Sequence, residues 1–152
     1  MNDWLHYWKP NSVPVLGKRL GHIAGSSFRK RDVAVGDRIF VITRRGATVL
    51  LMCDAIVTGF PSAGEVRARL GYEPYPGADH LFLDQRKGSP VRMDRVVPVD
   101  VLRRLRFLTQ SPSPSKRITT ALIRDDGSPD PQTFRALRLL LPQSAELLEQ
   151  LL

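Results

Sequence analysis

The amino-acid sequence predicts a single α+β domain over residues 1–152, a small and mainly antiparallel β-barrel with short helices packed on its outside. Two observations support this prediction. The chain has 152 residues, of which 42% are hydrophobic and 25% are charged, as in an ordinary globular domain with one core. Its apolar residues also fall into short runs separated by Gly, Pro and Asp turns, which is typical of sheets with tight connections.

The N-terminal part carries the clearest strand signals. Residues 4–8 are expected to form a first strand with aromatic side chains on both faces, one of which must face the core. After the Gly36-Asp37 turn, residues 38–43 are rich in β-branched and aromatic side chains. The turn at 44–46 and the long apolar run 47–58 then complete an antiparallel hairpin.

The middle of the chain predicts one short helix and several short strands. Ser62 and Glu65 have the spacing of a capping box, and Gly71 is placed to end the helix that starts there. Two strands, a helical turn and a further strand are expected at residues 80–84, 91–98, 100–103 and 106–109, in that order.

The C-terminal part is expected to close the domain. Residues 111–116 are rich in Ser and Pro and predict a surface loop, and residues 117–152 predict a closing strand and C-terminal helices. The strand is expected at 118–123. One helix is expected from Pro131 to Leu141, with Asp130 as its N-cap, and a last one from Ser144.

The charge balance favours a polyanionic partner. The net charge is +8, and the whole surplus lies in residues 1–110, where 18 basic residues face 10 acidic ones. Arginine supplies 18 of the 23 basic residues, and its planar guanidinium suits phosphates and bases, although a GC-rich genome produces the same bias. Nucleic acid is favoured over a membrane, because the chain has no basic amphipathic helix.

Several chemical classes are disfavoured. His6, His22 and His80 lie far apart without a Cys or carboxylate at metal-ligand spacing, so neither a metal nor another cofactor is expected. The sequence has no glycine-rich phosphate loop and no Gly-x-Ser-x-Gly elbow. The lone Cys53 in an apolar run, the lack of a signal-like N-terminus and the lack of a long apolar segment together predict a cytoplasmic protein.

One segment stands out as a candidate binding loop. Residues 17–31 contain five basic residues and no acidic one, around a central Gly25-Ser26-Ser27-Phe28. Small residues allow close approach of a ligand, and hydroxyls can bond a base edge or a phosphate. The aromatic residues Trp4 and Trp8 can stack bases beside this loop. The alternatives are a solvated basic loop and two tryptophans that only pack the core.

Two stretches resemble EVE domains of the PUA-like superfamily. Residues 4–10 (Trp-Leu-His-Tyr-Trp-Lys-Pro) resemble the opening strand of that family. Residues 28–40 resemble its arginine-bearing helix, its Val-x-x-Gly-Asp turn and the strand that follows. The resemblance implies a PUA-like barrel whose pocket accepts a modified or extruded base, with modified DNA favoured over RNA.

The resemblance also implies site residues, with departures. Trp8 stands where the family has a pocket-lining serine, and Thr43 where a family histidine ends a strand. Gly25-Ser26-Ser27-Phe28 replaces the family's Gly-Val-Arg-Asn, so this loop offers hydroxyls where the family has an arginine and an amide. The expected base pocket comprises Trp8, Ser26, Ser27, Phe28, Thr43 and His80. The expected backbone contacts are Lys18, Arg19, Arg29, Lys30, Arg31, Arg44 and Arg45.

The favoured function is therefore a non-catalytic reader of a modified or flipped base. Two alternatives stay open. One is an enzyme that acts on RNA or a nucleotide, like some ASCH-type relatives, with His6, His22 or Asp79 as its reactive group. The other is a specificity or interaction subunit for a separately encoded nuclease.

Overall fold

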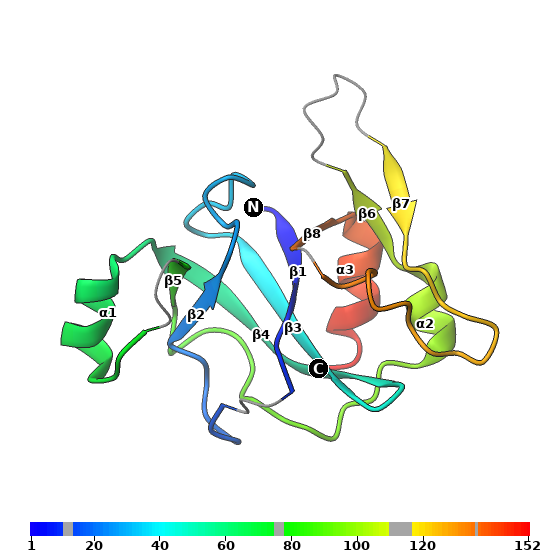
Figure 1. Ribbon diagram of the computed structural model, residues 1–152, viewed down its shortest axis with the longest axis horizontal. Coiled ribbons are helices and arrows are strands. Elements are labelled where there is room, and N and C mark those ends of the chain that lie inside the picture. The colour runs from blue at the N-terminus through cyan, green and yellow to red at the C-terminus, as the bar shows by residue number, and fades with distance from the viewer. Residues whose placement is uncertain (11–13, 75–77, 110–116, 136) are drawn as a thin grey trace.

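The computed structural model describes residues 1–10, 14–74, 78–109, 117–135 and 137–152, which form a sheet of eight strands and three short helices (Figure 1). The strands are β1 (Asp3–Tyr7), β2 (His22–Gly25), β3 (Arg38–Arg45), β4 (Thr48–Gly59), β5 (Asp79–Leu83), β6 (Arg106–Leu108), β7 (Ile118–Thr120) and β8 (Arg138–Leu140). The helices are α1 (Ala63–Leu70), α2 (Val99–Arg104) and α3 (Pro142–Glu149). The predicted β-rich domain with short helices is thus confirmed.

The sheet is mixed and open. Its strand order is β2-β5-β4-β3-β1-β8-β6-β7. Neighbouring strands are antiparallel except for β1 and β3, which run parallel from the pair Asp3–Arg38 to the pair Tyr7–Ile42. Among the described residues no ladder joins the edge strands β2 and β7, so the expected barrel closure is not seen.

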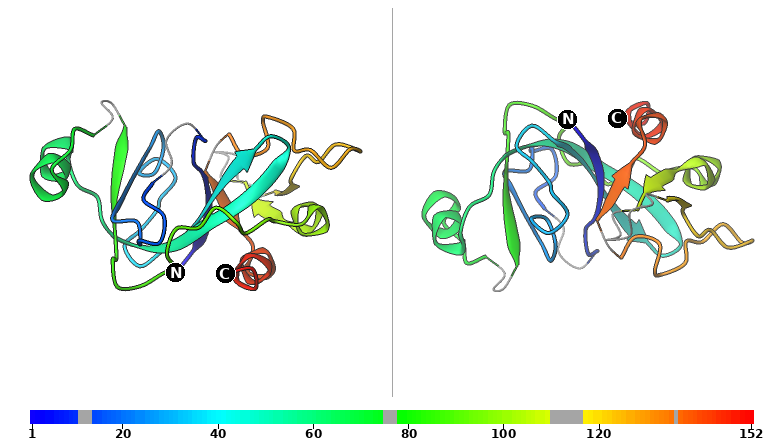
Figure 2. Two further views of the ribbon diagram at one scale, coloured as in Figure 1. Left: turned by 90° about the horizontal axis from the view of Figure 1, so that it is seen from below. Right: turned by 90° about the horizontal axis from the view of Figure 1, so that it is seen from above.

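The predicted hairpin forms the centre of the sheet as β3 and β4. Both of its faces are buried, because alternate residues of β3 enter two separate cores: Ile39 and Val41 one, Phe40 and Ile42 the other. A strand covered on both faces has no need of exposed polar residues, which explains the apolar run at residues 49–53 of β4. Figure 2 shows α1 at one end of the molecule and α2 and α3 at the other.

The predicted start and end of α1 are confirmed. The Ser62 hydroxyl accepts a hydrogen bond from the Glu65 backbone N–H, and the Glu65 carboxylate accepts one from the Ser62 N–H. Gly71 ends the helix in the left-handed conformation, with φ +74°. The last helix, α3, begins at Pro142, two residues before the expected Ser144, because proline is favoured in the first helical turn.

The expected helix from Pro131 to Leu141 is wrong. Residues 138–140 form strand β8, which lies between β1 and β6, and described residues before it form turns. The apolar spacing that predicted a helix also suits this path: Leu137 enters the core with Trp4, whereas Leu140 enters the core on the other sheet face. Pairing with β1 and β6, which are distant in the sequence, therefore decided that this segment is a strand and not a helix.

Other boundaries differ in smaller ways. Residues 91–98 form no strand within the described structure and contribute only an isolated bridge from Val96 to Leu50. The arginine-bearing segment after Phe28 forms turns and not a helix. Strand β7 ends at Thr120 and not at residue 123. The expected surface loop at 111–116 lies outside the described residues.

Asp37 ties β1 to β3. Its carboxylate accepts hydrogen bonds from the indole N–H of Trp4 at 2.8 Å, the Asn2 N–H at 2.9 Å and the Ala34 N–H at 2.9 Å. Asp37 is only 3% exposed, so these donors replace the water that a carboxylate otherwise needs. The Gly-Asp turn therefore fixes the start of the parallel pair.

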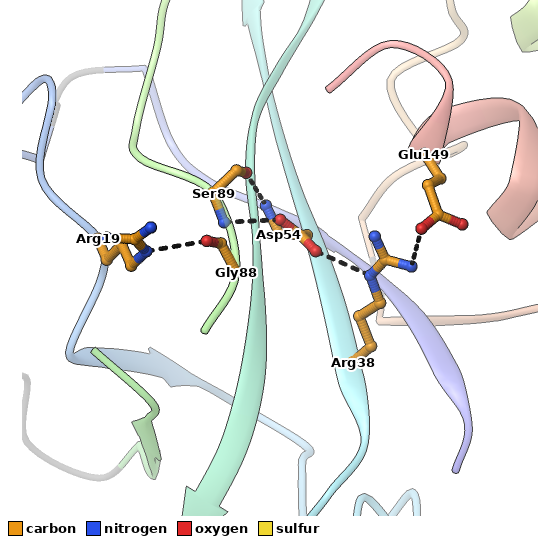
Figure 3. A network of polar contacts seen from close by, with 6 residues as sticks. All are labelled: Arg19, Arg38, Asp54, Gly88, Ser89 and Glu149. Carbon is orange, nitrogen blue, oxygen red and sulfur yellow. Dashed lines mark hydrogen bonds and ion pairs between the residues drawn. The ribbon is translucent and has the colours of Figure 1, made fainter. Parts of the chain in front are cut away.

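A second buried carboxylate joins three elements (Figure 3). Asp54 on β4 accepts hydrogen bonds from Arg38 Nε on β3 and from the Ser89 backbone N–H, both at 2.8 Å. Arg38 also lies 3.3 Å from the Glu149 carboxylate on α3. These contacts pin the loop around Ser89 and the C-terminal helix onto the central hairpin.

The same loop reaches the basic segment of the chain. Gly88 has φ +84°, and an added Cβ would lie 2.4 Å from the Asp54 carbonyl oxygen, so only glycine fits. Its carbonyl oxygen accepts a hydrogen bond from Arg19 Nε at 2.9 Å, as Figure 3 shows. This hydrogen bond holds Arg19 in place on the protein surface.

Candidate functional site

A cleft of about 1770 Å³ lies where the end of β1 meets β2 and the loop that follows it. Its described lining comes from residues 6–9, 14–15, 18–28, 70–74, 78, 85, 130–135 and 137 and from Arg44. Typical small-molecule pockets occupy roughly 300–1,000 Å³. The cleft is therefore larger than a typical small-molecule pocket.

The lining of the cleft is positively charged. Its described residues include five basic and two acidic side chains: Lys9, Lys18, Arg19, Arg44 and Arg135 against Glu73 and Asp130. Both acids face arginines outside the lining, Glu73 at 3.1 Å from Arg67 and Asp130 at 3.9 Å from Arg124. The electrostatic potential in the cleft therefore suits an anionic ligand.

Trp8 forms one aromatic wall and is held by its backbone. Its N–H donates to the Ile42 carbonyl at 2.7 Å, and its carbonyl accepts a hydrogen bond from the Thr43 hydroxyl at 2.8 Å. The half-buried side chain packs against the core that contains Trp4 and also lines the cleft. Trp8 thus occupies both roles that the sequence left open, packing and cleft wall.

The segment Gly25–Phe28 forms another part of the cleft lining. Phe28 is only 1% exposed, and its ring lies so close to Gly25 that an added Cβ would meet it at 2.7 Å. The His6 ring packs against Phe28 with centroids 5.5 Å apart, and burial lowers the pKa of His6 from 6.5 to about 4. Ser26 is exposed and Ser27 half-buried, and both line the cleft.

A chain of three titratable side chains runs from the cleft into the protein. His22 Nδ1 lies 2.8 Å from the Tyr72 hydroxyl, and His22 Nε2 lies 3.0 Å from His80 Nδ1. Burial, and to a lesser extent the neighbouring His80, lowers the pKa of His22 to about 4. The imidazole of His22 is therefore neutral at physiological pH, with one ring nitrogen as donor and the other as acceptor.

This chain can carry a proton in two arrangements. Either the Tyr72 hydroxyl donates to His22, which donates to His80, or both hydrogen bonds run in reverse. In the second arrangement the Tyr72 O–H is left to donate into the cleft. Tyr72 is 48% exposed and lines the cleft with His22. The arrangement can present either a donor or an acceptor to a ligand.

The structure brings most of the expected base-pocket residues together, since Trp8, Ser26, Ser27 and Phe28 all line the cleft. Thr43 and His80 do not. Thr43 is 1% exposed and holds the Trp8 carbonyl, and His80 is 5% exposed behind His22. Both act on the cleft through a neighbouring residue.

The expected backbone contacts divide into two groups. Lys18, Arg19 and Arg44 line the cleft, whereas Arg29, Lys30, Arg31 and Arg45 lie outside its lining. Arg29 donates to the Phe60 carbonyl at 3.3 Å, and Arg45 to the Met93 carbonyl at 3.1 Å. Arg44 and Arg45 are separated because successive residues of strand β3 point to opposite faces, whereas residues 29–31 lie in the turn after Phe28.

Sequence reasoning missed several of the cleft residues. Lys9, Tyr72 and Arg135 carry no local signal that marks them as site residues. They come from an N-terminal strand end, a Pro-containing loop and a turn before β8. Asp79, expected as a reactive group, instead accepts a hydrogen bond from the Arg29 backbone N–H at 3.0 Å and lies outside the lining.

The described part of the chain contains no group of three or more metal-ligating side chains and no helix of the length and hydrophobicity that a membrane span requires. No protein-family model, no characterised protein and no solved structure matches the chain.

Proposed function

We propose that this chain is a nucleic-acid-binding module that holds one base in the cleft, stacked on Trp8. The observation that carries the proposal is that a single cleft combines an anchored aromatic ring, two serine hydroxyls and a surplus of cations. Modified DNA is favoured over RNA as the ligand, because the EVE domains that the sequence resembles read modified cytosine. A PUA-like arrangement of the sheet belongs to the same proposal.

The contacts available in the cleft can offset the cost of extruding a base. Extruding a base from a duplex costs a few kcal/mol. Stacking on one aromatic ring returns about 1–3 kcal/mol, and hydrogen bonds from Ser26 or Ser27 to a base edge add to it. The backbone of Trp8 is held by two hydrogen bonds before any ligand arrives. Little conformational freedom is therefore lost when a base stacks.

The test is binding of the full chain to short duplexes with one modified or one plain cytosine, measured by fluorescence anisotropy. Trp8→Ala should weaken binding to the modified duplex by about 5- to 150-fold, the equivalent of about 1–3 kcal/mol of stacking. Phe60→Ala is the matched control, because Phe60 is half-buried against the same core but lies outside the cleft lining. Equal losses for both variants would show that Trp8 only packs the core.

Salt dependence tests the cationic rim separately. If about four or five phosphates are neutralised, the log–log slope of affinity against salt should be about −4 on duplex DNA and about −3 on single strands. A flat salt dependence, or no binding at low salt, would overturn the proposed function.

An enzyme that acts on RNA or a nucleotide, of the ASCH-like type, is a second candidate. The Tyr72–His22–His80 chain favours it, since the exposed Tyr72 hydroxyl can take a proton from a ligand as it passes its own proton to the neutral imidazole of His22, which acts as a general base through Tyr72. Incubation with RNA and free nucleotides, followed by chromatography, should then yield a product. His22→Gln should abolish that product and Tyr72→Phe should reduce it. Unchanged turnover in His22→Gln would exclude this role.

A specificity subunit for a separately encoded nuclease stays a prediction. No observation on the described residues bears on such a protein partner.

A further inference from the structure

One cation of the cleft has an unsatisfied hydrogen-bonding group. Three buried side-chain atoms lack a hydrogen-bond partner within the described residues: Asp3 Oδ1, Arg44 Nε and Thr119 Oγ1. Of these residues only Arg44 lines the cleft. A buried donor without a partner costs about 1–3 kcal/mol, and more when the group is charged. Because this Nε–H has no hydrogen bond within the protein to break, the Arg44 side chain gains a partner when it turns toward an anion in the cleft.

A second observation is the position of Lys9. Strands β1 and β3 pair in parallel as far as Tyr7 and Ile42, and just beyond this pair the Thr43 hydroxyl donates to the Trp8 carbonyl at 2.8 Å. Lys9 follows Trp8 and Arg44 follows Thr43, so the two cations flank this contact, and both line the cleft. An anion bound there is attracted by both charges. Both acidic side chains of the cleft are already paired with other arginines.

We infer that Arg44 and Lys9 form a phosphate-binding subsite beside Trp8. The inference rests on the proposed function and deepens it, because it defines the ligand as a nucleotide unit, a base together with its phosphate, and not a bare base. The Nε–H and one terminal N–H of a guanidinium point the same way and match two phosphate oxygens. The unpartnered Nε–H of Arg44 is one half of that fork. Lys9 adds a point charge to the same anion.

Substitutions can separate this role from general charge. Arg44→Gln removes the charge and the fork, and Arg44→Lys keeps the charge but loses the fork. Arg45→Gln is the matched control: it removes the same charge from the next residue, which is exposed, donates to the Met93 carbonyl and lies outside the cleft lining. Thermal melting without ligand checks that each variant folds.

The probes are deoxycytidine, deoxycytidine monophosphate and inorganic phosphate, titrated by calorimetry into the full chain. The monophosphate should bind at least about 10-fold more tightly than the nucleoside. Arg44→Gln should remove this preference, Arg44→Lys should reduce it, and Arg45→Gln should leave it unchanged. Inorganic phosphate should raise the melting temperature of the wild type and of Arg45→Gln but not of Arg44→Gln.

The outcomes separate the subsite from the proposed function. Equal affinity for nucleoside and monophosphate, or equal losses in Arg44→Gln and Arg45→Gln, would overturn the subsite. Phosphate binding that depends on Arg44, without any binding of oligonucleotides, would support the subsite and overturn the nucleic-acid proposal. An oligonucleotide without terminal phosphates distinguishes the two sources of phosphate. It should displace inorganic phosphate if the subsite takes a backbone diester, and should not if the subsite takes only a free nucleotide.

Discussion

Replacement of Asp37 by alanine should destabilise the fold by about 4 kcal/mol. The carboxylate is 3% exposed and accepts three hydrogen bonds, from Trp4, Asn2 and Ala34. A hydrogen bond to a charged group contributes about 1.5–3 kcal/mol, and each buried donor left behind is unsatisfied. The Asn2 N–H is only part-buried and can bond water in the variant. The expected loss is therefore close to the sum of three hydrogen bonds at the lower end of this range.

Asp37→Asn separates hydrogen bonding from packing. The amide has nearly the same volume but only one acceptor oxygen, and its NH₂ group must face at least one of the donors that the carboxylate accepts. The expected loss is about 2 kcal/mol, between wild type and Asp37→Ala. The exposed Asp125 provides the control, and Asp125→Ala should change stability by less than about 0.5 kcal/mol.

The assay is urea unfolding followed by tryptophan fluorescence, with the m-value compared across variants to check that the unfolding reaction is the same. In thermal melts, about 4 kcal/mol corresponds to a decrease of about 8–16 °C for a chain of this size. A loss below about 1 kcal/mol for Asp37→Ala would refute the idea that this carboxylate fixes the β1–β3 pair. Equal stability of Asp37→Asn and wild type would refute the claim that two acceptor oxygens are needed.

Two further predictions concern the cleft. Gly25→Ala should destabilise the fold by about 1–3 kcal/mol and weaken ligand binding, because the new Cβ would meet the buried Phe28 ring at 2.7 Å and displace part of the cleft lining. Thermal melting measures the loss of stability and anisotropy the loss of binding. Unchanged values would contradict the close packing of Gly25 against Phe28. Stability should also fall as the pH drops from 6.5 toward 4. The pKa values of His6 and His22 are lowered from 6.5 to about 4 in the folded chain, so the unfolded chain binds more protons between these pH values. The stability present above pH 6.5 is therefore lost as the pH falls, by about 1.4 kcal/mol per pH unit for each histidine. His22→Gln should roughly halve that slope in urea unfolding, and an unaltered slope would mean that His22 does not titrate there.

The sequence by itself determined the elements whose signals are local. The run of β-branched and aromatic residues at 38–43 fixes a strand whatever lies beside it, and the Gly46 turn brings the next strand back onto it. The Ser62 capping box and Gly71 satisfy the ends of α1 with groups that lie within the helix itself. Such interactions form between neighbours in the chain, so they can be predicted from the sequence without knowledge of the tertiary structure.

The tertiary structure decided the elements whose side chains suited more than one conformation. The segment after Pro131 has apolar residues at helical spacing, yet β1 and β6 each offered an open edge, and Leu139 pairs with both Trp4 and Leu108. Backbone hydrogen bonds to two neighbouring strands, with apolar residues buried on both sheet faces, outweighed the local helical preference. A parallel pair such as β1–β3 likewise depends on where the intervening chain returns.

The candidate site shows the same division. The composition of residues 17–31 and the resemblance around Trp8 predicted one wall of the cleft from neighbouring residues. Arg44 reaches that wall only because β3 lies parallel to β1, and Tyr72 reaches it through a hydrogen bond to His22, 50 residues earlier in the chain. Contacts across such separations depend on the path of the whole backbone, which the core determines by burying the two faces of the central hairpin in different clusters.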